Sequence, residues 1–116
     1  MDLRSLAGGV GGVARITTRW LVRGGFKALG ITAHEGIVLI ALIDRADKHT
    51  GIAWPSQLLL VRDLGIARST IQGALARLLA VGAIAEHEPG RPGRSTRYRV
   101  CDVPEQPARE AGRFVA

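Results

Sequence analysis

Side chains capable of hydrogen bonding or ion pairing gather in the stretch RSTIQGALAR, residues 68–77. The Gln72 amide both donates and accepts hydrogen bonds, so it can pair bidentately with an adenine edge. The hydroxyls of Ser69 and Thr70, and the guanidinium groups of Arg68 and Arg77, can bind phosphate oxygens. These residue types predict noncovalent recognition of a polyanion, with Gln72 as the best candidate for distinguishing bases.

A helix over residues 68–81 is predicted to position these side chains. Its apolar residues recur at helical spacing and predict one buried stripe, formed by Ile71, Ala74, Leu75, Leu78 and Leu79. Gly82 then suits the left-handed position that ends a helix. The opposite side carries Ser69, Gln72, Gly73 and Ala76. Gly73 and Ala76 would form a low surface that lets a groove approach the backbone.

A shorter helix is predicted immediately before this one, with a tight turn at residues 64–67 between them. Ser56 follows Pro55 and can accept a hydrogen bond from a free N–H group of the first helical turn. The remaining apolar residues of this helix can face the core, which leaves Leu58 or Leu59 exposed. Because an exposed apolar pair indicates an interface, Leu58 and Leu59 are a candidate dimer contact.

Two alternating segments, residues 83–87 and 96–100, predict a pair of strands after the second helix. The sequence between them, EPGRPGRS at 88–95, predicts an exposed loop with Arg91 and Arg94 at its tip. Arg97 and Arg99 share one face of the second strand. Arg91 and Arg94 would bind phosphate or enter a narrow minor groove, and Arg97 and Arg99 would point at the DNA backbone. The alternative is a hairpin loop that contacts only solvent.

A further helix is predicted to begin at Thr32, which forms a capping box with Glu35. It continues to about Ala46. Its sequence GIVLIALI, residues 36–43, is apolar on all sides and therefore needs partners on more than one face. The helix 68–81 would cover one face, and the strand pair or a second subunit another. A short strand is predicted after it, with Trp54 in the core.

Basic residues recur every four positions before this helix and would form one stripe if the segment were helical: Arg15, Arg19, Arg23 and Lys27. The pair Gly24-Gly25 disfavours a long helix there. Two interpretations stay open, and both can hold together. The segment covers the core with Trp20 and Leu21, or it is a basic arm whose arginines bind phosphate or reach a groove.

Four segments follow one another along the chain: GIAWPSQ at 51–57, LVRDLGIARSTI at 60–71, LLAVGAI at 78–84 and GRSTRYRV at 93–100. Their order and spacing resemble the winged helix-turn-helix domains of bacterial mobile elements, which occur in transcriptional regulators and plasmid replication initiators. The resemblance implies a mainly α fold with a small β wing, in which a three-helix core carries a two- to three-stranded β-hairpin sheet and binds double-stranded DNA. It also implies a serine cap before the recognition helix, where this chain has Ala67.

The composition is consistent with one domain and a polyanionic partner. With 47% hydrophobic and 22% charged residues, the chain of 116 residues can bury a core, and its formal net charge is +6. The single cysteine, Cys101, excludes an internal disulfide and an all-cysteine zinc site. No apolar run approaches the roughly 20 residues of a membrane span. We expect a cytoplasmic, nucleoid-associated protein without cofactor, metal or small-molecule ligand.

The expected organisation is a flexible N-terminal arm at residues 1–14, a winged helix-turn-helix domain at 15–100 and a C-terminal tail at 101–116. No set of Ser, His and Asp, paired carboxylates or phosphate-binding loop indicates an enzyme. The sequence favours a transcriptional regulator that binds double-stranded DNA as a homodimer. Two alternatives remain open: a DNA-binding component of plasmid or mobile-element replication or partition, and a winged-helix protein-interaction module.

Overall fold

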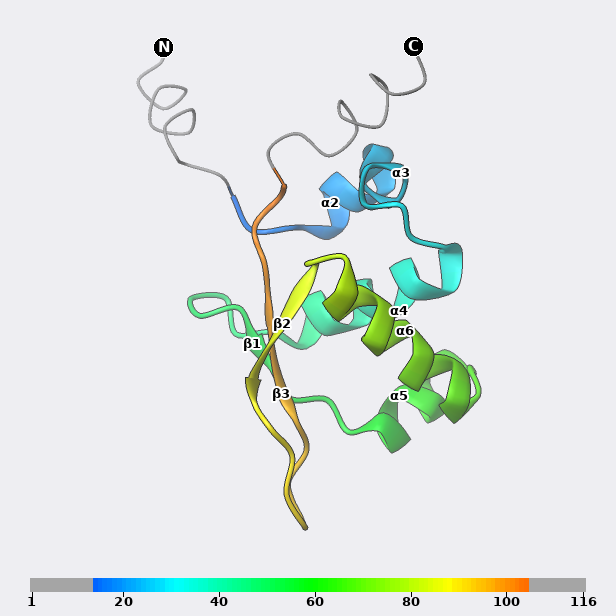
Figure 1. The fold of residues 1–116 in the computed structure, drawn as a ribbon, viewed down its shortest axis with the longest axis vertical. Coiled ribbons are helices and arrows are strands. Elements are labelled where there is room, and N and C mark those ends of the chain that lie inside the picture. The colour runs from blue at the N-terminus through cyan, green and yellow to red at the C-terminus, as the bar shows by residue number, and fades with distance from the viewer. Residues whose placement is uncertain (1–13, 105–116) are drawn as a thin grey trace.

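The computed structural model describes residues 14–104 and shows a mainly helical fold with a small antiparallel sheet (Figure 1). The elements are α2 (Thr18–Trp20), η1 (Leu21–Gly25), α3 (Phe26–Leu29), α4 (Ala33–Arg45), β1 (Ile52–Ala53), α5 (Gln57–Leu64), α6 (Arg68–Ala80), β2 (Ile84–Glu88) and β3 (Arg97–Val100). The three strands are arranged in the order β1-β3-β2. The architecture is the predicted winged helix-turn-helix, with α5 and α6 as the helix pair and the β2–β3 hairpin as the wing.

α4 is the central helix of the core. It begins with the predicted capping box, in which the Thr32 hydroxyl accepts from the Glu35 N–H at 3.2 Å and the Glu35 carboxylate accepts from the Thr32 N–H at 2.9 Å. Leu39 and Leu42 are fully buried, and each such side chain contributes about 1.5–3 kcal/mol to folding. α6 packs along one side of α4, and Phe26 of α3 contacts it on another.

The segment before α4 is helical but not one continuous helix. α2 and α3 are separated by η1, where Gly24 has a φ of 114°, a conformation that favours glycine. Arg15 lies outside these helices and donates to two backbone carbonyls of the α4–β1 loop, both at 3.2 Å. The basic residues of this segment therefore do not form the single stripe that a straight helix would give. Leu21 is buried and Trp20 half-buried, as expected of a segment that covers the core.

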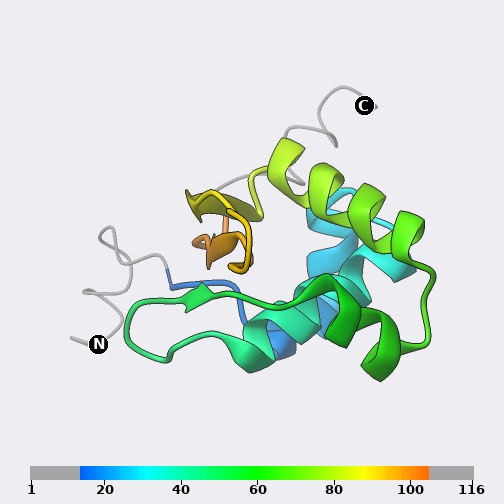
Figure 2. The ribbon, with the colours of Figure 1, turned by 90° about the horizontal axis from the view of Figure 1, so that it is seen from below.

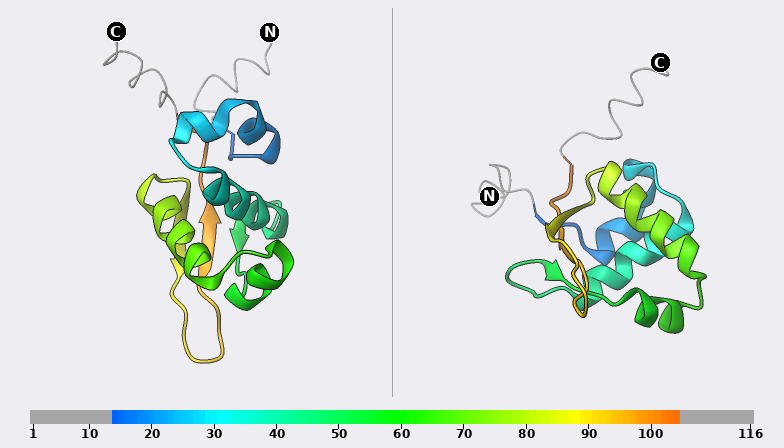
Figure 3. Two further views of the ribbon diagram at one scale, coloured as in Figure 1. Left: turned by 90° about the vertical axis from the view of Figure 1, so that its right-hand side faces the viewer. Right: turned by 60° about the horizontal axis from the view of Figure 1, so that its bottom comes forward.

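The wing is an antiparallel hairpin that extends beyond the helical body (Figure 3). Its register pairs Ile84 with Val100, and a bulge follows between Glu86 and Glu88. At the tip, the backbones of Arg91 and Arg94 exchange hydrogen bonds of 3.0 and 2.8 Å. The two residues between them are a proline and Gly93, which has a φ of 79°, the order that a type II turn favours.

Trp54 is exposed, so its predicted place in the core is wrong. Ala53, the residue before it, is completely buried, whereas Trp54 is 55% exposed. Successive side chains of a strand point to opposite faces, and Ala53 takes the inward position at the end of β1. The Arg97 guanidinium instead lies over the Trp54 ring, 4.9 Å from its centroid. This cation–π contact holds the indole on the outer side of the sheet.

The two ends of the described chain lie side by side. The Ile16 N–H donates to the Cys101 carbonyl at 3.0 Å, and the Val103 N–H donates to the Ala14 carbonyl at 2.9 Å. Backbone pairing thus continues past residue 100, the predicted domain boundary. The rest of the predicted arm and tail, residues 1–13 and 105–116, lies outside the described residues. Between residues 14 and 104, no helix has the length and apolarity needed to cross a membrane.

Two helical glycines differ in what surrounds them, and this difference predicts opposite effects of alanine. A Cβ at Gly36 of α4 would lie 2.2 Å from the Phe26 ring, whereas a Cβ at Gly73 of α6 would meet nothing within 4 Å. We expect Gly36→Ala to lower the free energy of unfolding by about 1–3 kcal/mol through overpacking. Gly73→Ala should raise it by about 1 kcal/mol because alanine has the higher helix propensity. Urea unfolding measures the free energy of unfolding of both variants, and equal stabilities of Gly36→Ala and Gly73→Ala would contradict the contact with Phe26.

Candidate nucleic-acid interface

α6 buries its apolar stripe and exposes the opposite side. Ile71 and Leu78 are fully buried, whereas Leu79 at the edge of the stripe is 36% exposed. The polar and small residues predicted to face DNA are all exposed: Arg68, Ser69, Thr70, Gln72, Gly73, Ala76 and Arg77. In Figure 2, α6 lies along one side of the molecule with α4 on its inner side. The helix is thus presented to a partner along most of its length.

The two helices of the helix-turn-helix begin differently. The Ser56 hydroxyl caps α5 as predicted, accepting from the N–H groups of Leu58 at 3.1 Å and Leu59 at 3.3 Å. α6 begins after Ala67, which provides no side-chain cap. The first-turn N–H groups of α6, next to the Ser69 hydroxyl, therefore remain available to an anion, which the positive end of the helix dipole also attracts.

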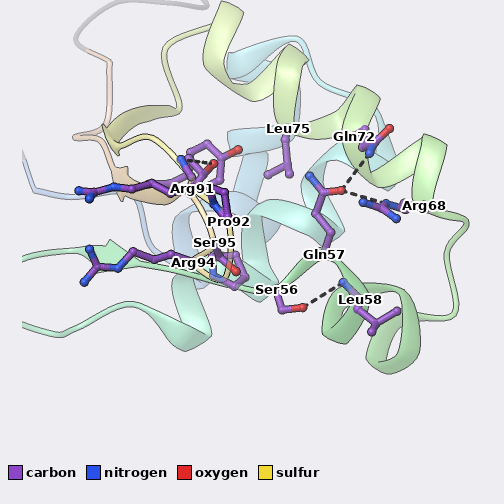
Figure 4. A pocket seen from close by; sticks show the side chains of 14 residues that line it. Ser56, Gln57, Leu58, Arg68, Gln72, Leu75, Arg91, Pro92, Arg94 and Ser95 are labelled. Carbon is purple, nitrogen blue, oxygen red and sulfur yellow. Dashed lines mark hydrogen bonds between the residues drawn. The ribbon is translucent and has the colours of Figure 1, made fainter.

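An open groove of about 670 Å³ separates the start of the helix pair from the wing (Figure 4). Residues 55–58 and three residues of α6, Arg68, Gln72 and Leu75, form one wall. The other wall is the wing, residues 90–92, 94–96 and 98. The fold thus places the helix pair and the wing on the two sides of one surface.

Gln57 joins the candidate site although the sequence did not single it out. Its amide oxygen accepts from Nε2 of Gln72 at 3.0 Å and from Nε of Arg68 at 3.4 Å. The available signal was its position directly after the Ser56 cap, which places it at the start of α5. Its proximity to α6 depends on the angle between the two helices, which the sequence pattern does not give.

Arg77 is directed toward the helical body. Its Nη2 donates to the Gly30 carbonyl at 3.2 Å, and its Nε lies 4.0 Å from the Glu35 carboxylate. The side chain is 49% exposed. Arg77 therefore ties α6 to the start of α4, and it would have to leave these acceptors to bind a phosphate.

The wing arginines converge on one carboxylate. Glu88 lies 3.2 Å from Arg91 and 3.4 Å from Arg94 through one oxygen, and 3.5 Å from Arg97 through the other. Figure 4 shows the Arg91 and Arg94 side chains extending away from α6. The cations of the wing are thus gathered on its outer side, and their charge is partly neutralised by Glu88.

The remaining predicted residues are spread over other surfaces. Arg19 and Arg23 are exposed, but α2 and η1 lie at the end of the molecule opposite the wing tip (Figure 1). Arg99 is exposed on β3. Leu58 and Leu59 are 74% and 40% exposed, and Leu58 lines the groove. A dimer contact at Leu58 would therefore compete with any ligand in the groove.

Two titratable side chains near the sheet stay protonated at neutral pH. Burial raises the pKa of Tyr98, which lines the groove, and the nearby Glu86 carboxylate raises it further. Its hydroxyl is therefore a hydrogen-bond donor. Burial also raises the pKa of the Cys101 thiol, which makes it a poor nucleophile. Within the described part of the chain, no three His, Cys, Asp or Glu side chains are grouped as metal ligands would be.

Comparison with known proteins agrees with this arrangement. No curated protein matches the chain. Residues 29–82 match the family model of a helix-turn-helix domain, and this range runs from the end of α3 through α4, β1, α5 and α6. The match, together with the exposed face of α6, supports a DNA-binding helix-turn-helix domain at residues 29–82.

Proposed function

We propose that this protein is a transcriptional regulator that reads the major groove of double-stranded DNA with residues 68–81 and binds neighbouring phosphates or the minor groove with its wing, residues 88–95. The observation that carries the proposal is the exposed face of α6, which continues into the groove between helix pair and wing. The match of residues 29–82 to a helix-turn-helix domain supports it independently.

The dimensions of α6 suit the major groove. Its 13 residues give a length of about 20 Å at the usual helical rise, and a major groove of about 12 Å width admits such a helix. Gln72 would pair with adenine, while Gly73 and Ala76 keep the surface between contacts low. So few base-reading side chains predict modest selectivity, with most of the affinity coming from phosphates.

Phosphate contacts would come from two places. The first turn of α6 offers uncapped N–H groups and the hydroxyls of Ser69 and Thr70. The wing offers Arg91 and Arg94, for which a phosphate oxygen could replace the Glu88 carboxylate as partner. Arg91 and Arg94 line the groove, but their guanidinium groups extend away from α6 (Figure 4) and would have to turn toward a duplex bound on α6.

We further propose that the regulator acts as a homodimer on half-sites about 34 Å apart, the spacing that places two recognition helices on one face of the duplex. The exposed Leu59 is the better of the two predicted contacts, because Leu58 lines the groove. Light scattering with and without DNA measures the oligomeric state. Footprinting separates regulation from replication, since a regulator protects a site near its promoter and a replication factor protects repeats at an origin.

Salt dependence tests DNA binding itself. If four or five phosphates are contacted, affinity for random duplex DNA should fall by about 100-fold or more between 50 and 200 mM salt. The loss reflects competition by counterions that the arginines displace on binding. Fluorescence anisotropy with a labelled duplex measures this fall. A flat response would contradict the proposal and favour a protein-interaction module.

Gln72→Ala should reduce the discrimination between DNA sequences, whereas Arg94→Ala should reduce the affinity for all of them. Removing the Gln72 amide should relax discrimination at one base pair by about 1–3 kcal/mol, while removing the Arg94 cation should weaken all sequences alike. Competition among duplexes that differ at single positions measures both effects. If Gln72→Ala also weakened every duplex equally, Gln72 would not be a base-reading residue.

Glu88→Gln should strengthen DNA binding. It removes the carboxylate that pairs with three arginines of the wing, so we expect affinity for every duplex to rise by about 2- to 5-fold, the scale of exposed ion pairs. Glu86→Gln is the matched control because it makes the same charge change on the same strand, and no ion pair of Glu86 occurs among residues 14–104. Equal gains in the two variants would show that the pairing with arginine is immaterial.

A further inference from the structure

We propose that Gln57 is a positioning residue that sets the direction of the Gln72 amide, and thereby the base that Gln72 reads. The inference rests on the proposed function, in which Gln72 contacts a base. Gln57 is the first residue of α5, and its side chain lies in the groove facing α6 (Figure 4).

The amide oxygen of Gln57 accepts hydrogen bonds from two residues of α6. Nε2 of Gln72 lies 3.0 Å away and Nε of Arg68 lies 3.4 Å away. Because Arg68 and Gln72 are four residues apart, they are neighbours on the surface of α6. A single acceptor from α5 thus connects two successive turns of the candidate base-reading surface.

Arg68 determines the direction of both amides. A guanidinium group has only donors, so the Gln57 atom that faces it must be the oxygen. Since the same oxygen faces Gln72, Gln72 must present its nitrogen. Reversing either amide would place two donors or two acceptors opposite each other and lose a hydrogen bond. Because Arg68 has only donors, it fixes the orientation of the Gln57 amide, and Gln57 in turn fixes the orientation of the Gln72 amide.

Gln72 keeps one N–H group and its oxygen for another partner. The oxygen points away from Gln57 (Figure 4). An N–H group beside an oxygen is the pair that matches N7 and the N6 amino group of adenine in the major groove. Gln57 holds this pair in one order and reduces the rotamer freedom that Gln72 loses on binding. It would thus contribute to discrimination between bases without contacting a base.

The test compares Gln57→Leu with Gln57→Glu. Leucine removes the acceptor, whereas glutamate keeps an oxygen toward Arg68 and Gln72. The preferred duplex is first selected from a randomised pool with the unaltered protein. The base pair read by Gln72 is then the one whose alteration no longer changes the dissociation constant of the Gln72→Ala variant. For each protein, the dissociation constant is measured on the preferred duplex and on the duplex altered at that base pair, and the ratio is compared.

We expect a ratio of about 5- to 100-fold for the unaltered protein and for Gln57→Glu, and one below about 3-fold for Gln57→Leu. The added charge of glutamate weakens all duplexes through repulsion, and the ratio cancels this effect. Thermal melting verifies that both variants are folded. Full discrimination in Gln57→Leu, or its loss in a folded Gln57→Glu, would overturn the inference. If the Gln72→Ala variant discriminates at every base pair as well as the unaltered protein does, the proposed role of Gln72 as a base-reading residue is contradicted, and the role of Gln57 is contradicted with it.

Discussion

Burial of one side of α6 against α4 is the constraint on which the rest of the structure depends. Leu39 and Leu42 of α4 and Ile71 and Leu78 of α6 are fully buried between the two helices and their neighbours. Because a helix repeats every 3.6 residues, burying this stripe leaves the side that carries Gln72 outside. The separate packing of α5 against α6 brings Gln57 next to Gln72. Exposure of the recognition surface thus depends on the packing of α6 against α4, and orientation of its amide depends on the contact between α5 and α6.

The net charge of +6 does not describe how the cations are used. Glu88 lies within ion-pair distance of three wing arginines, Arg77 bonds to the helical body, and Arg45 pairs with Asp63 at 2.6 Å. Each acceptor holds a guanidinium in one place and also competes with a phosphate for it. Affinity for DNA would therefore depend on the difference between the bonds that these arginines make within the protein and those that they would make to phosphates. The bonds within the protein are weak enough to be replaced, since exposed ion pairs contribute only about 0–1 kcal/mol each. This balance gives acidic residues such as Glu88 an influence on binding that a count of charges misses.

Local features, which depend on residues close together in the sequence, were predicted correctly. The Thr32–Glu35 capping box, the Ser56 cap and the exposed loop with Arg91 and Arg94 at its tip depend on residues within a few positions of one another, and all three form as predicted. Trp54 was misplaced because its size suggested burial. Which of two adjacent strand residues faces inward depends on the pairing of β1 with β3, and this pairing turns Ala53 inward.

The sequence by itself determined the helix-turn-helix, the wing and the exposed face of α6, because hydrophobic periodicity and capping residues specify which side of an element is buried. Only the tertiary structure decided which polar groups meet across elements. The bonds from Gln72 to Gln57, from Arg77 to Gly30, and from Arg94 to Glu88 all depend on helix crossing angles and strand register. A one-dimensional pattern records which residues are polar, whereas the identity of a partner depends on angstrom-scale geometry.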